Sequence, residues 1–133
     1  MNKKMLISIL VIFVMAMGLD FLFHAVLLAP DYARLANLYR IQSDQENHFP
    51  FMILAHVILA IGFVWIYNKG KEEKPWVAQG IRFGLAVAVL SAIPHYLIYY
   101  AVQPLPGLLV FKQILFGTIT FVLMGIVTAG LNR

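Results

Sequence analysis

Four long apolar stretches constrain this chain more than any other feature of its sequence. They run from about residue 5 to 28, 49 to 67, 77 to 102 and 107 to 131. A membrane-spanning helix needs about 20 mostly apolar residues, so each stretch is long enough for one span. Only helices and closed barrels satisfy their backbone polar groups inside a bilayer. The sequence therefore predicts an all-α membrane protein, a four-transmembrane-helix bundle that forms a single domain over residues 1–133.

Composition supports this class and narrows the chemistry available to the chain. Hydrophobic residues make up 62% and charged residues only 12%, which is far from the composition of a soluble domain. The chain has no cysteine, so disulfides, thiolate metal sites and iron–sulfur clusters are excluded. The net charge of +4 comes from residues at the ends of the apolar stretches, where it signals topology. We therefore expect the lipid bilayer as a partner and no nucleic acid.

The positive charges are distributed asymmetrically among the connections. The first connection holds only Arg34 and Arg40, and the third connection holds no lysine or arginine. The amino terminus, the second connection with its flanks and the carboxyl terminus hold the other basic residues that flank spans: Lys3, Lys4, Lys69, Lys71, Lys74, Arg82 and Arg133. The positive-inside rule then predicts a multi-pass protein of the bacterial cytoplasmic (inner) membrane with both termini in the cytoplasm.

The first connection is the long one and has two parts. Residues 30–40 begin with Pro30 and Asp31 and continue with apolar residues at helical spacing, which predicts a short interfacial helix on the outer surface. Residues 42–48 are polar, and we expect them to form a surface loop with a solvated His48.

The third stretch carries two further structural signals. Gly80, Gly84, Ala88 and Ala92 recur every four residues and form a smooth ridge suited to close helix packing inside the bundle. Pro94 lies within the same stretch and predicts a kink, because proline removes one backbone hydrogen bond.

Ionisable residues occur inside all four spans. With a rise of about 1.5 Å per residue, they lie at one depth, roughly 7 to 13 Å below the outer surface. Such residues are costly in a bilayer, so they usually face the bundle interior, pair with one another and mark function. The candidate ligand-binding residues are Asp20, His24, His56 and His95, with Lys112, Gln113, Tyr96 and Tyr99 as supporting polar groups.

Two interpretations of this polar layer stay open. Asp20 and Lys112 would form a charge pair that fixes the order of the helices. Alternatively, His24, His56 and His95 would bind a metal ion, a haem or another ligand such as a quinone. An ammonium group at Lys112 opposes a bound metal cation.

The segment from Asp20 to Leu28, with Tyr32, Tyr39 and Arg40 downstream and the segment 80–84, resembles small uncharacterised four-span bacterial membrane proteins. Those proteins carry an aromatic residue followed by histidine near the end of the first span. The resemblance implies the four-span fold and the importance of His24, and it implies no activity.

Three function classes fit the sequence. The first is an accessory or binding module whose site in the outer half of the membrane binds a metal, a haem or a quinone. The second is a structural or assembly subunit that docks other membrane subunits, or a second copy of itself, through small-residue ridges. The third is a small proton-coupled transporter that uses Asp20. No nucleophile elbow, phosphate-binding loop or zinc-protease motif is present, so an enzymatic function has little support.

Overall fold

The computed structural model describes residues 1–133 and is all-helical, without strands. Four helical segments are long and apolar enough to cross a membrane, which confirms the predicted class. The first comprises α1 (Lys3–Asp20) and a π-helix, η1 (Phe21–Leu27). The second is α3 (Gln42–Gly70), the third comprises α4 (Trp76–Leu90) and α5 (Ala92–Val102), and the fourth is α6 (Gly107–Leu131).

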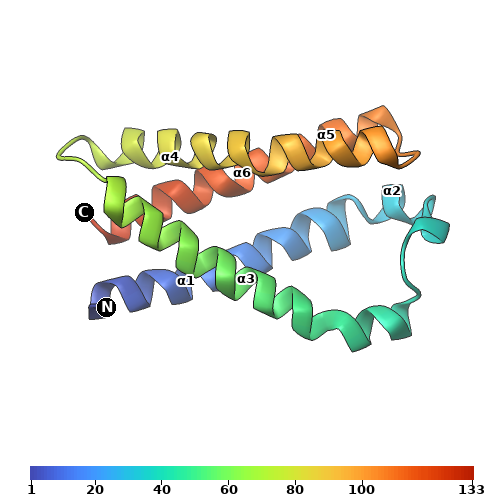
Figure 1. Ribbon diagram of the computed structural model, residues 1–133, viewed down its shortest axis with the longest axis horizontal. Helices are drawn as coiled ribbons and strands as arrows, with labels where there is room; N and C mark the ends of the chain where they lie inside the picture. Colours follow the sequence, from blue (N-terminus) through green and yellow to red (C-terminus); the bar gives the residue numbers. More distant parts are fainter.

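Helix α6 is the centre of the bundle, because it contacts α1, α3, α4 and α5. Helices α1 and α3 pack on each other, and α4 packs along α6 (Figure 1). Both termini lie at the same end of the molecule, which we call the termini end. The first and third connections lie at the opposite end (Figure 1). The apolar core sits where α1, α3 and α6 meet and consists of Ile12, Ala16, Ala60, Phe63, Val64 and Met124.

Most large apolar side chains point away from this core. Only 24 of the 133 residues are buried in the protein, and the spans carry exposed leucine, isoleucine and phenylalanine along their length. In water such a surface would drive aggregation, whereas in a bilayer it faces lipid tails of similar polarity. The chain is therefore a multi-pass membrane protein.

The start of the second span differs from the sequence prediction. The predicted surface loop at residues 42–48 is wrong, because these residues form the first turns of α3. Arg40 pairs with Asp44 at 2.8 Å, and Gln45 donates to the Arg40 carbonyl at 2.6 Å. His48 bonds the Asp44 carbonyl oxygen at 2.7 Å. These contacts support helical turns in a segment whose polar composition suggested a loop.

The first connection holds two short helical pieces where the sequence predicted one helix over residues 30–40. These pieces are α2 (Ala29–Ala33) and the 3-10 turn η2 (Ala36–Leu38). Leu35, between them, leaves the helical region with φ −117° and ψ 27°. The break lets Tyr32 turn its ring toward both Tyr39 and His24.

The small-residue ridge of α4 packs against α6 as expected. A Cβ atom placed on Gly84 would lie 2.6 Å from the Val122 Cα atom, and one on Gly80 would lie 2.6 Å from the Gly125 carbonyl oxygen. Such separations leave no room for a side chain, so the two backbones are in direct contact. This internal packing occupies the ridge at Gly80 and Gly84.

A buried polar cluster joins three helices at the termini end. The Asn132 side chain donates to Ser8 Oγ of α1 and to the Thr128 carbonyl, each at 2.8 Å. It also accepts from Asn68 Nδ2 of α3 at 3.2 Å. The cluster satisfies its polar groups internally, and nothing in the sequence pattern singled it out.

Candidate functional site

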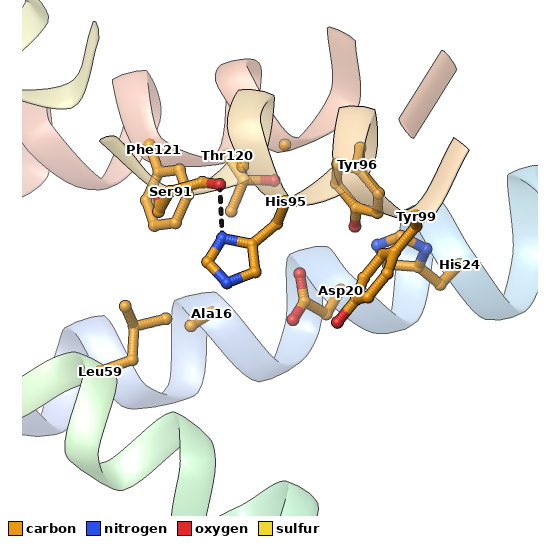
Figure 2. A pocket seen from close by; sticks show the side chains of 12 residues that line it. Ala16, Asp20, His24, Leu59, Ser91, His95, Tyr96, Tyr99, Thr120 and Phe121 are labelled. Carbon is orange, nitrogen blue, oxygen red and sulfur yellow. Dashed lines mark hydrogen bonds between the residues drawn. The ribbon is translucent and has the colours of Figure 1, made fainter. Parts of the chain in front are cut away.

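The candidate site is a cavity of about 270 Å³ between the first and third spans. Its walls come from α1, η1, α3, α5 and α6, and six of its twelve lining residues are hydrophobic. Four of the predicted site residues line it: Asp20, His24, Tyr96 and Tyr99. A fifth, His95, reaches into it from the opposite wall (Figure 2). The cavity therefore combines apolar walls with a few converging polar groups, as ligand sites do.

Irregular helix geometry builds the first wall. Residues 21–27 form a π-helix, in which the Leu28 amide donates to the Phe23 carbonyl five residues back at 2.8 Å. Such segments are rare and occur frequently at functional sites. The wider turn follows directly after Asp20 and carries His24, so it sets how these two side chains are placed along the wall. No pattern in the sequence predicted this π-helix.

A helix break builds the second wall and confirms the kink predicted near Pro94. Ser91 separates α4 from α5 with φ −126° and ψ −78°. Its carbonyl oxygen accepts from the His95 amide at 3.1 Å and from His95 Nδ1–H at 2.8 Å (Figure 2). Because Nδ1 carries the proton, Nε2 of neutral His95 is left as an acceptor.

His56 stands behind Asp20, as seen from the cavity. Its Nε2 lies 2.6 Å from Asp20 Oδ2, and its Nδ1–H donates to the Met52 carbonyl at 2.7 Å. The His56 side chain is 10% exposed and the Asp20 side chain 42% exposed. This pair joins α1 to α3 and leaves the carboxylate open to the cavity on its other side.

His24 belongs to a hydrogen-bonded chain that enters from the first connection. Gln113 Nε2 donates to the Tyr32 hydroxyl at 3.1 Å, and that hydroxyl lies 2.7 Å from His24 Nδ1. Burial raises the pKa of the Tyr32 hydroxyl, so it remains a donor and gives its own proton to His24 Nδ1. Sequence reasoning did not identify Tyr32 as part of the site, because it lies outside the spans.

Lys112 does not pair with Asp20, so the expected charge pair is wrong. Its ammonium group lies 3.3 Å from a carboxylate oxygen of Asp31, in the first connection. Asp20 instead uses His56 as its partner. Residue number alone allowed either partner for Asp20, and the packing of the helices pairs it with His56.

The three histidines do not gather around one point. His24 bonds Tyr32, His56 bonds Asp20 and Met52, and His95 bonds the Ser91 carbonyl. No group of three or more histidine, aspartate or glutamate side chains is arranged to hold a metal ion. The arrangement therefore gives the metal hypothesis no support, and it offers hydrogen-bond donors and acceptors to an organic ligand instead.

No family model, no curated protein and no solved structure matches this chain.

Proposed function

We propose that this protein is an integral membrane binding module that holds the polar head of a small, bilayer-soluble organic molecule. The observation that carries the proposal is the cavity of about 270 Å³, in which hydrophobic residues make up six of the twelve lining residues and Asp20, His24 and His95 are among the others. A head group placed there meets the carboxylate of Asp20 and the imidazoles of His24 and His95. The rest of the molecule extends into the lipid.

Lateral access supports a ligand that arrives from the membrane. His95 and Tyr99 line the cavity and are exposed on α5, the part of the third span that ends at Val102, and Tyr99 is 44% exposed. Because both side chains lie within a membrane-spanning segment, we infer that this side of the cavity opens toward lipid. A water-soluble ligand would need an opening at the end of the bundle.

The size of the cavity selects among the ligands considered from the sequence. Pockets for drug-sized ligands start at roughly 300 Å³, so this cavity suits one substituted ring or a compact head group. A haem macrocycle is much larger than this cavity. A quinone ring or a small polar head of similar size fits.

The orientation proposed for the protein places the cavity in the outer half of a bacterial cytoplasmic membrane. The basic residues of the termini and of the second connection support an N-in/C-in topology. In this orientation α2 and η2 lie at the outer interface, and the second connection faces the cytoplasm. The ligand is then captured from the outer leaflet.

Native mass spectrometry of the protein in mild detergent tests the binding function. We expect a co-purified small molecule that is released on activation and identified by its mass. His24→Ala and His95→Ala should each reduce its occupancy at least about tenfold, because each removes a polar contact to the head group. His48→Ala is the matched control, since His48 lies outside the cavity. Equal occupancy in all four proteins, or no bound molecule in any, would contradict the proposal.

A second candidate function is small proton-coupled transport, and one observation favours it. Asp20 lines the cavity and is bonded to a titratable partner, His56. Proteoliposomes with an imposed proton gradient distinguish the two functions, because a transporter accumulates its substrate and a binding module does not. The assembly-subunit hypothesis gains no such support, since Gly80 and Gly84 are occupied by α6.

A further inference from the structure

The hydrogen bonds of His56 fix how many protons it shares with Asp20. The Met52 carbonyl oxygen, 2.7 Å from Nδ1, has only lone pairs to offer, so Nδ1 carries a hydrogen. The 2.6 Å contact between Nε2 and Asp20 Oδ2 then needs one more hydrogen between two basic atoms. Wherever that hydrogen resides, the pair has no net charge. Losing it would leave the pair with one negative charge.

The rest of the cavity offers acceptors and aromatic faces. His95 directs Nδ1–H to the Ser91 carbonyl, so its neutral form presents Nε2 as an acceptor. The rings of Tyr96, Tyr99 and Phe121 form part of the wall. Carboxylate oxygens and the faces of aromatic rings attract organic cations, and the attraction is largest where water is excluded.

No lysine or arginine lines the cavity, and Lys112, the lysine of the fourth span, is paired elsewhere. Lys112 had been the objection to a bound cation, but its ammonium group lies 3.3 Å from Asp31. With no fixed cation in the walls, the hydrogen shared by Asp20 and His56 is the one positive charge that balances the carboxylate.

The titratable groups around Asp20 come from several elements. η1 contributes His24 and α3 contributes His56, whereas the lining residues of α6 do not titrate. α5 and the first connection contribute His95, Tyr96, Tyr99, Tyr32 and Asp31, the last already paired with Lys112. Asp20 is the carboxylate among the lining residues, so its direct bond to His56 is the one that a cation at the carboxylate would have to disturb.

We propose that the cavity binds a lipophilic organic monocation in exchange for the proton shared by Asp20 and His56. This inference rests on the proposed binding function and names its ligand class. The charges balance: the cation enters, one proton leaves the pair for solvent, and the site stays neutral overall. Inside a low-dielectric span this exchange avoids the cost of a net charge.

Calorimetric titration with benzyltrimethylammonium tests the exchange, because this cation has a permanent charge that pH does not change. The full-length protein is titrated at pH 7 in two buffers of different ionisation enthalpy, which yields the number of protons released. We expect close to one proton per bound cation. Binding should weaken by about tenfold for each unit by which pH is lowered, as linkage of one proton requires.

Neopentylbenzene is the matched neutral probe, since a carbon atom replaces the charged nitrogen. We expect it to bind at least about tenfold more weakly than the cation and to release no proton. Asp20→Asn keeps the shape of the side chain and should abolish proton release and weaken cation binding at least about tenfold. Asp44→Asn, an exposed carboxylate outside the cavity, should leave both quantities unchanged.

Three outcomes would overturn the inference. Cation binding without proton release would contradict the proposed exchange. Equal affinity for benzyltrimethylammonium and neopentylbenzene would show that the cavity does not select for positive charge. Failure of both probes to bind removes the cation as ligand class. The binding function itself is judged separately by the co-purified molecule and its loss in His24→Ala and His95→Ala. A neutral co-purified ligand that depends on these histidines would keep the function and overturn the exchange.

Discussion

Two regions of the bundle differ sharply in packing density: the α4–α6 interface is closely packed, whereas a cavity lies between α1 and α5. Along α4, glycines bring the backbone against α6 so closely that no Cβ atom fits at Gly84. Farther along the same span, Ser91 breaks the helix and α5 carries large aromatic residues around a void. The first region gains dispersion contacts between backbones. The second leaves space lined with polar groups, which is useful only if something occupies it.

The largest effect should come from filling the close-packed region. Gly84→Ala introduces a methyl group that overlaps the α6 backbone at Val122, which cannot move as a side-chain tip can. We expect the free energy of unfolding to fall by about 1 to 3 kcal/mol or more, as overpacking does. Unfolding by SDS in mixed micelles measures it.

Gly62→Ala is the control for this substitution, because a Cβ atom there would meet nothing within 4 Å. It should be neutral, or slightly stabilising through higher helix propensity. Equal losses in both variants would mean that the α4–α6 contact is not specially tight, and the comparison between the two regions would fail.

The next largest effect should come from the polar pair beside the cavity. His56→Ala leaves the Asp20 carboxylate without its partner and opens a gap between α1 and α3. We expect a loss of about 2 kcal/mol, in the range for hydrogen bonds to charged groups. A double-mutant cycle with Asp20→Asn should show that the two losses are not additive. Additive losses of unfolding free energy would show that Asp20 and His56 do not interact with each other.

A smaller loss should follow removal of the Tyr32 hydroxyl. Tyr32→Phe breaks the chain between Gln113 and His24, and we expect about 1 kcal/mol of destabilisation. Tyr39→Phe is the control, because Tyr39 contacts the Tyr32 ring edge-on, with centroids 5.4 Å apart, and that contact does not depend on its hydroxyl. SDS unfolding would show whether only the first variant is destabilised.

The same tyrosine predicts a dependence on alkaline pH. Burial raises the pKa of Tyr32 in the folded protein above the ordinary tyrosine value of 10.0. Its contribution to stability is therefore fully present below about pH 10 and is lost as pH rises through the higher folded-state pKa. The decline in unfolding free energy above pH 10 should be shallower in Tyr32→Phe. An identical decline in both proteins would assign it to other groups.

The smallest effect should come from the ion pair at the opposite end. The Lys112 and Asp31 side chains are 36% and 24% exposed, so solvent and ions weaken their attraction. Asp31→Asn should cost between about 0 and 1 kcal/mol, with the loss falling as salt is added. A loss larger than that of His56→Ala would show that this pair, rather than Asp20 and His56, fixes the helix arrangement.

The sequence by itself determined the number of spans, their approximate ends and the interruption near Pro94. These are local properties, because the length of an apolar run and the missing amide of a proline act within one helix. It also placed Asp20, His24, His56 and His95 at one depth, since helical rise converts residue number into depth. The early start of α3 was not foreseen, because its first turns are held by side-chain contacts in a polar segment.

Only the tertiary structure decided which of these groups meet. The predicted depth in the membrane is compatible with pairing of Asp20 with either Lys112 or His56. Which pair forms depends on which helices are neighbours and how each is rotated about its axis. Because α1 packs on α3, Asp20 lies beside His56. Lys112 pairs with Asp31 instead. The π-helix at residues 21–27 and the cavity beside it are likewise features that no sequence pattern indicated. Partner choice is a property of the assembled bundle, because it depends on directions in space that no single helix encodes.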